Sequence, residues 1–100
     1  MKKVFISQPM GNKTIDEITE VRQNAIEHVE KLFNDEVKVL DSFMLDDIKG
    51  KDPLWLLGKS IQIMAEADVV YFAKGWQEAR GCRIEHECAL SYEVATVIEE

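Results

Sequence analysis

Short apolar runs alternate along the chain with longer segments in which apolar residues recur every three or four positions. The short runs predict β-strands over residues 3–7, 36–40, 68–73 and 93–98. The longer segments predict helices over residues 15–33, 53–67 and 83–92. Strands that alternate with helices in this way indicate a parallel sheet with right-handed crossovers. The pattern therefore predicts an α/β protein with a flavodoxin-like, three-layer α/β/α fold and a four-stranded parallel sheet in the order 2-1-3-4.

Two helix starts carry local signals of their own. Thr14 and Glu17 stand at the spacing of a capping box, in which each side chain bonds the backbone N–H of the other residue. Asp52 followed by Pro53 is typical of a cap and a first helical turn. The polar segment 44–52 between the second strand and this helix is predicted to be a loop.

Length and charge restrict the class of protein. One hundred residues fit a single domain over residues 1–100, and no apolar run approaches the ~20 residues that span a membrane. The net charge of −7 argues against DNA or RNA as a partner, because phosphates require a basic surface. The start of the chain has no signal-peptide pattern, so we expect a cytoplasmic protein.

Metal-binding and disulfide-forming residues are few. Cys82 and Cys88 are expected to be reduced thiols, since the chain carries no export signal. His28 and His86 do not supply a zinc-binding spacing with them. We therefore expect neither a metal nor another cofactor.

The predicted topology indicates where a ligand would bind. Open α/β sheets bind ligands beyond the carboxyl ends of their strands, where the strand order reverses. Here the reversal lies between the first and third strands, and the loops that leave these strands are residues 7–13 and 74–81. The first loop precedes a helix N-terminus, which favours an anion, but its glycine spacing matches neither a Walker loop nor a dinucleotide fingerprint.

The second loop holds residues with two interpretations each. Trp76 is either a stacking platform for a base or sugar, or an anchor that packs the loop on the core. Arg80 and Arg83 either bind a phosphate or pair with Glu78 and Glu87 at the surface.

Glu85 is predicted to lie in the first turn of the last helix, beside the pocket. A carboxylate there is stabilised by the helix dipole. It can act as a nucleophile at the anomeric carbon of a sugar, or it can simply complement the dipole.

Two stretches of this sequence resemble the nucleoside 2-deoxyribosyltransferase-like superfamily. They are residues 6–10 (Ile-Ser-Gln-Pro-Met), and residues 67–72 (Ala-Asp-Val-Val-Tyr-Phe) together with residues 81–89 (Gly-Cys-Arg-Ile-Glu-His-Glu-Cys-Ala). The chain is most similar to a branch of small bacterial and phage proteins in that superfamily. The resemblance covers nearly the whole chain, and its strongest part is the third strand with the loop and helix that follow.

The resemblance implies a reaction and a set of site residues. Members of the superfamily transfer deoxyribose between bases or hydrolyse the N-glycosidic bond of deoxynucleoside 5′-monophosphates. It implies Glu85, four residues before an alanine, as the catalytic nucleophile. It further implies a nucleoside or nucleotide as the small-molecule partner, and a homodimer or larger homo-oligomer. The residues expected to bind the substrate are Ser7, Gln8, Met10, Gly11, Ser60, Trp76 and Arg80.

Two departures from the family pattern keep a second function open. Ser60 stands where these enzymes have an aspartate, and a serine cannot supply a proton as a carboxylic acid does. Gly11 and Asn12 stand where close relatives have Arg-Gly, so a bidentate phosphate partner is missing. The chain is therefore either an N-glycosidase or deoxyribosyltransferase, or a protein that binds a nucleotide-like ligand without turnover. A structural protein that retained only the fold is a third interpretation.

Overall fold

The computed structural model describes residues 1–40 and 52–99. This part of the chain forms four strands, three α-helices and one short 3-10 helix in alternating order. Their bounds are β1 (Lys2–Ser7), α1 (Ile15–Phe33), β2 (Val37–Val39), α3 (Pro53–Met64), β3 (Val69–Phe72), the 3-10 helix η1 (Trp76–Glu78), α4 (Arg80–Ser91) and β4 (Ala95–Ile98). The predicted loop 44–52 lies outside the described residues except for Asp52.

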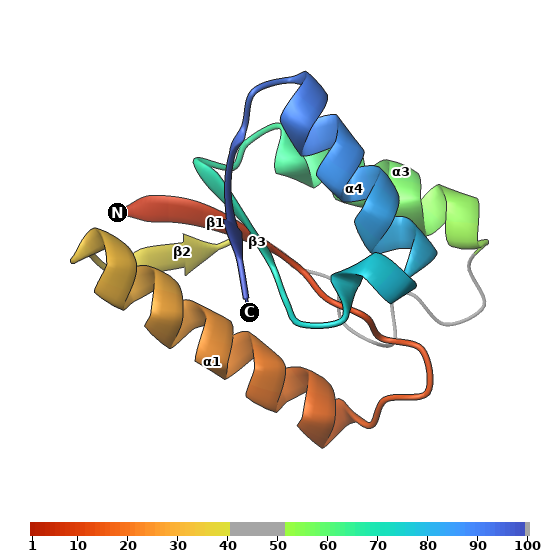
Figure 1. The fold of residues 1–100 in the computed structure, drawn as a ribbon, viewed down its shortest axis with the longest axis horizontal. Coiled ribbons are helices and arrows are strands. Elements are labelled where there is room, and N and C mark those ends of the chain that lie inside the picture. The colour runs from red at the N-terminus through yellow and green to blue at the C-terminus, as the bar shows by residue number, and fades with distance from the viewer. Residues whose placement is uncertain (41–51, 100) are drawn as a thin grey trace.

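The four strands form one parallel sheet in the order β2-β1-β3-β4. Helix α1 covers one face of the sheet, and α3 and α4 lie together on the opposite face (Figure 1). This arrangement confirms the predicted flavodoxin-like three-layer α/β/α fold and its strand order. No helix in the described ranges is long and apolar enough to cross a lipid bilayer.

The core is divided by the sheet into two clusters, because successive side chains of a strand point to opposite faces. Val4 and Ile6 of β1 belong to the cluster that packs against α1. Phe5 of β1 and Phe72 of β3 belong to the cluster that packs against α3 and α4. Ser7 is two residues after Phe5, so its side chain points to the α3 and α4 face as well.

The predicted helix caps are both present. The Thr14 side chain accepts a hydrogen bond from the Glu17 backbone N–H at 3.1 Å, and the Glu17 side chain accepts one from Thr14 at the same distance. Asp52 Oδ1 accepts from the Leu54 backbone N–H at 2.8 Å, and Pro53 opens α3. These contacts confirm the capping box and the Asp-Pro helix start.

The start of α4 differs from the prediction. The helix begins at Arg80 rather than Arg83, because Ala79 is extended (φ −100°, ψ 122°) and its carbonyl already accepts a helical bond from Arg83. The 3-10 helix η1 lies within residues 74–81, which were predicted to form a loop. Glu85 therefore lies in the second turn of α4, and its predicted place in the first turn was wrong.

Other elements are also shorter than predicted. Helix α3 ends at Met64 rather than near Ala67, because its last turn closes with tighter hydrogen bonds three residues back. Strand β4 begins at Ala95 rather than Glu93, since Glu93 has the left-handed φ of 58° and cannot extend a strand. Strand β2 is limited to Val37–Val39.

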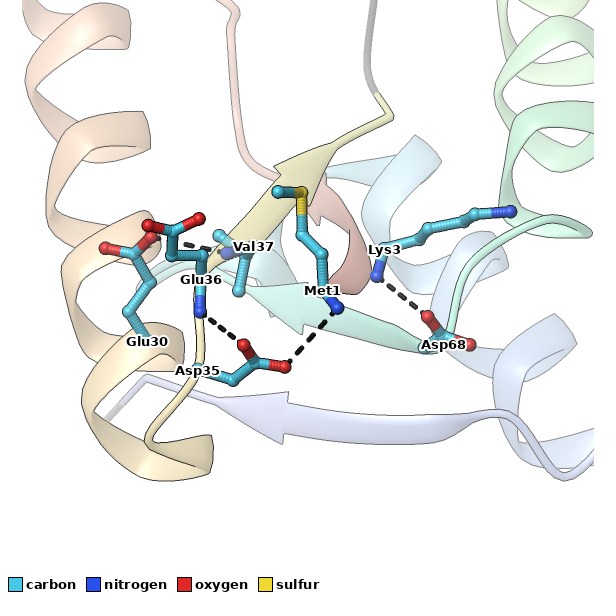
Figure 2. A network of polar contacts seen from close by, with 7 residues as sticks. All are labelled: Met1, Lys3, Glu30, Asp35, Glu36, Val37 and Asp68. Carbon is cyan, nitrogen blue, oxygen red and sulfur yellow. Dashed lines mark hydrogen bonds and ion pairs between the residues drawn. The ribbon is translucent and has the colours of Figure 1, made fainter.

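Carboxylates hold the amino end of the sheet through main-chain groups (Figure 2). Asp68 Oδ2 accepts a hydrogen bond from the Lys3 backbone N–H at 2.8 Å, and Glu30 Oε2 accepts one from Val37 at 3.3 Å. Asp35 Oδ2 lies 3.5 Å from the N-terminal ammonium group of Met1. The contacts of Asp68 and Asp35 tie the start of β1 to the segments before β3 and β2, and the contact of Glu30 ties α1 to β2.

Candidate active site

A cavity of about 630 Å³ lies at the carboxyl end of β1, next to β3, where the strand order reverses. Its wall is built by three segments that are far apart in the sequence. They are residues 5–10 at the end of β1, residues 52–54, 56–57 and 60 of α3, and residues 79–82, 84 and 85 at the start of α4. This is the position at which open α/β sheets bind ligands.

Glu85 is the buried carboxylate of this cavity. Its side chain is turned from α4 toward β1, and the residue is only 7% exposed. Oε1 of Glu85 accepts a hydrogen bond of 2.6 Å from the Ser7 hydroxyl, which is 78 residues away in the sequence. That length is typical of a hydroxyl that donates to an ionised carboxylate. The Glu85 carboxyl group is thus held at the cavity wall by a side-chain donor.

Ser7 owes its position to the sheet. It is the last residue of β1, it pairs with Phe72 of β3, and its carbonyl accepts from the Ala73 N–H at 2.9 Å. The residue is 2% exposed. Its hydroxyl is therefore fixed by strand pairing at the point where α4 presents Glu85.

Cys82 is the second ionisable group in contact with this pair. It lies three residues before Glu85, on the same side of α4, and is buried. Burial raises the pKa of the Cys82 thiol; a hydrogen bond with Ser7 lowers it in part, and the negative charge of Glu85 raises it further. A thiol with a raised pKa stays protonated at neutral pH, so Cys82 is a poor nucleophile.

Most of the residues predicted to bind substrate line this cavity: Ser7, Gln8, Met10, Ser60 and Arg80. Gly11 lies apart from them, on the wall of a neighbouring cavity of about 560 Å³. Gln8 lines both cavities, but its Nε2 donates to the Ile18 carbonyl of α1 at 3.3 Å. Its Oε1 is buried and has no hydrogen-bond partner within the described residues.

Trp76 lies outside both cavity walls as far as the described residues form them. Its ring packs at 4.2 Å from that of His86 and at 5.5 Å from that of Phe72, measured between ring centroids. It also borders the core cluster on the α3 and α4 face. Of the two interpretations, this packing supports the loop anchor.

The two arginines of the second loop have different surroundings. Arg83 Nη1 donates to the Gln77 carbonyl at 2.9 Å, so its guanidinium closes the turn before α4. Arg80 is the first residue of α4 and lines the cavity. Ala79, the N-cap of α4, has no side chain that could cap the first N–H groups. The start of α4 and Arg80 together present positive charge at the cavity.

Sequence reasoning missed several residues of the wall. Asp52 lines the cavity in addition to capping α3. Leu54, Leu56 and Leu57 give the wall an apolar surface on the α3 side. The signal was the unusually apolar start of this helix, which the prediction used only to place the helix. An apolar wall with a few polar groups is typical of a small-molecule site.

Metal-binding geometry is not found among residues 1–40 and 52–99. No group of three or more His, Cys, Asp or Glu side chains there is arranged to hold a metal ion. Cys82 and Cys88 are both free thiols.

Comparison with known proteins adds no family assignment. No model of a known protein family matches this chain, and no curated protein matches it. Membership of the nucleoside 2-deoxyribosyltransferase-like superfamily thus stays a prediction made from the motifs, and the chemistry must be argued from the cavity and its buried carboxylate.

Proposed function

We propose that this protein is a nucleoside or nucleotide N-glycosidase or 2-deoxyribosyltransferase in which Glu85 is the nucleophile. The observation that carries the proposal is the buried Glu85 carboxylate, which accepts the Ser7 hydrogen bond at the wall of the cavity. A volume of about 630 Å³ lies in the range of small-molecule sites and accommodates a nucleoside.

The proposed reaction has two steps with Glu85 as the covalent centre. In the first, a carboxylate oxygen forms a bond with the anomeric carbon, and the N-glycosidic bond breaks with its electron pair passing to the base. The departing base takes a proton from water. In the second, water or another base attacks the anomeric carbon and releases the carboxylate. Attack by water transfers its hydroxyl to the sugar and returns one proton to the solvent.

Other groups of the cavity wall are suited to bind the phosphate and the ring of a nucleotide. Arg80 and the uncapped start of α4 favour a phosphate, since helix N-termini and arginines both bind anions. The leucines of α3 offer apolar contact to a base or sugar ring.

Asp52 supplies the other carboxyl group of the described cavity wall. Its Oδ1 accepts the Leu54 N–H at 2.8 Å, which fixes the side chain at the start of α3. In the second step Asp52 is the candidate base that takes the proton of the attacking water.

A second function is favoured by Ser60. This residue lines the cavity at the position where the family pattern has an acid, and a hydroxyl does not protonate a leaving base. The same cavity would then hold a nucleotide-like ligand without turnover.

A homo-oligomer is part of the proposal. Strands β2 and β4 are the edges of the sheet, and apolar side chains are exposed on α3 and α4 (Leu54, Trp55, Ile84 and Leu90). A cytoplasmic location is also proposed, because two free thiols fit a reducing compartment.

The test follows release of free base by chromatography. The protein, Glu85→Gln and the control Glu87→Gln are incubated with a panel of nucleosides and deoxynucleoside 5′-monophosphates. Glu87 is exposed on the same helix and accepts a hydrogen bond from Ser91. We expect release by the wild type and by Glu87→Gln, and a fall of at least about a thousandfold in Glu85→Gln.

Two other outcomes are decisive. A rise in melting temperature with a nucleotide, without base release, would support the ligand-binding function. Neither release nor a shift with any member of the panel would overturn both proposals.

A further inference from the structure

We propose that Ser7 is a positioning residue for Glu85, whose hydroxyl keeps the carboxylate ionised and in one orientation, and that it is not a contact for the substrate. The contact was not foreseen from the sequence, which assigned Ser7 to substrate binding. The inference deepens the proposed function and rests on it wherever turnover is concerned, but its structural part can be tested without a substrate.

The direction of the hydrogen bond follows from counting protons. A serine hydroxyl has one hydrogen, and an ionised carboxylate can only accept. At 2.6 Å between Ser7 Oγ and Glu85 Oε1, the single hydroxyl proton is committed to Glu85. Ser7 has no second proton with which to hold a phosphate or a sugar oxygen.

The Cys82 thiol beside Ser7 does not supply the negative charge of this cluster. Burial and the charge of Glu85 raise its pKa, and the opposing hydrogen bond with Ser7 lowers it only in part, so the thiol keeps its proton. The cluster of Ser7, Cys82 and Glu85 then carries one negative charge, located on the carboxylate.

Rigidity makes Ser7 suited to orienting another group. Its backbone is held by the pairing of β1 with β3, including the bond from the Ala73 N–H at 2.9 Å. The residue is 2% exposed, less than Glu85 itself, so a ligand in the cavity has little access to it. A donor fixed in this way holds the nucleophilic carboxylate ready before substrate arrives.

Removal of the hydroxyl should act on Glu85 in a measurable way. A buried carboxylate that loses a hydrogen-bond donor becomes easier to protonate. The matched pair Ser7→Thr and Ser7→Val tests this, because the two side chains have nearly the same shape and differ by the hydroxyl. Ser7→Ala is added as the smallest change. The control Ser91→Ala removes an exposed serine that donates to Glu87 on the same helix.

The first measurement is a ¹³C NMR titration of the glutamate side-chain carboxyls, with Glu85 identified by the loss of its signal in Glu85→Gln. We expect its titration midpoint to rise by about 1–2 units in Ser7→Val and Ser7→Ala, and to stay near the wild-type value in Ser7→Thr. In Ser91→Ala the Glu85 midpoint should not move. An unchanged midpoint in Ser7→Val would overturn the inference.

The second measurement is turnover of whichever nucleoside or nucleotide the wild type accepts. Ser7→Val and Ser7→Ala should lower kcat by about 10- to 100-fold with KM within about threefold, and should move the acidic limb of the pH profile to higher pH. Ser7→Thr should restore both. A rise in KM with kcat unchanged would overturn the inference in favour of a substrate contact. If the NMR shift is found but the wild type has no turnover, the inference stands and the proposed enzyme function fails.

Discussion

The two ends of the sheet use the same chemical group for different purposes. At the amino end, the exposed Asp68 accepts from a main-chain N–H at 2.8 Å. At the carboxyl end, the buried Glu85 accepts from a side-chain hydroxyl at 2.6 Å beside a cavity. An exposed carboxylate is well solvated and contributes modest stability, whereas a buried one must be held by donors. Burial and the type of donor, rather than the residue type, therefore separate a scaffold carboxylate from a candidate reactive one.

The same carboxyl end also carries a hydrogen-bonded polar cluster on its other face. On the α1 side, the Tyr71 hydroxyl donates to Glu99 at 3.0 Å and lies 3.1 Å from His28 Nδ1. Because the one hydroxyl proton goes to Glu99, His28 must be the donor in the second contact. Polar groups on this face hold the end of β4 against the sheet, while those on the α3 and α4 face surround the cavity.

The largest expected effect after that of Glu85 concerns Asp52. Asp52→Asn keeps an acceptor for the Leu54 N–H but removes the carboxylate from the cavity. If Asp52 takes the proton of the attacking water, base release should fall by about a hundredfold. Melting temperature should stay within about 2 °C of the wild type because the cap is preserved. Undiminished release in Asp52→Asn would remove Asp52 from the mechanism.

An effect of intermediate size is expected on the free energy of unfolding at alkaline pH. Burial raises the pKa of Tyr71 above its ordinary value of 10.0, and the hydrogen bond and charge of Glu99 raise it further. Above pH 10 the unfolded chain loses this proton and the folded chain keeps it. The free energy of unfolding should therefore fall by about 1.4 kcal/mol per pH unit there, and the stability is fully present below pH 10.

Urea unfolding of Tyr71→Phe at pH 8 to 11 measures this contribution. We expect the variant to lose about 1 kcal/mol at pH 8 and to show a shallower alkaline decline than the wild type. Tyr92→Phe is the matched control, since Tyr92 is 82% exposed. Equal alkaline declines in wild type and Tyr71→Phe would contradict the assignment.

The smallest effect is expected at the amino end of the sheet. Asp68→Ala removes the acceptor of the Lys3 N–H and should lower the free energy of unfolding by about 1 kcal/mol. Asp68→Asn retains an acceptor and should be close to the wild type. Base release should be unaffected in both variants. A large loss of activity in Asp68→Asn, measured under conditions where the protein is folded, would contradict the assignment of Asp68 as a purely structural carboxylate.

Local sequence signals predicted much of the fold. Helix α1 has the bounds expected for it, because the capping box of Thr14 and Glu17 lies immediately before its apolar pattern. The start of α4 was placed three residues late, since Gly81 and Cys82 carry no strong helix signal and Ala79 cannot supply a side-chain cap. Nothing in the sequence around Glu93 indicated its left-handed conformation, which shortens β4.

The candidate site could be predicted only in part. The reversal of strand order indicated the correct end of the sheet, and Glu85 and Arg80 lie on the cavity wall there. The direction of the Gln8 side chain toward α1 and of Trp76 toward His86 depends on packing that no spacing in the sequence encodes.

The alternation of strands and helices, the strand order and the end of the sheet that carries the cavity were all predictable from the amino-acid pattern. These follow from apolar periodicity and chain handedness, which act over short distances along the chain. The surroundings of Glu85, in contrast, depend on long-range packing. A hydrogen bond between residues 78 positions apart depends on the register of β1 against β3 and on the rotation of α4 over the sheet. Both are set by packing of the whole core. The sequence pattern therefore could not identify Ser7 as the hydrogen-bond donor to Glu85.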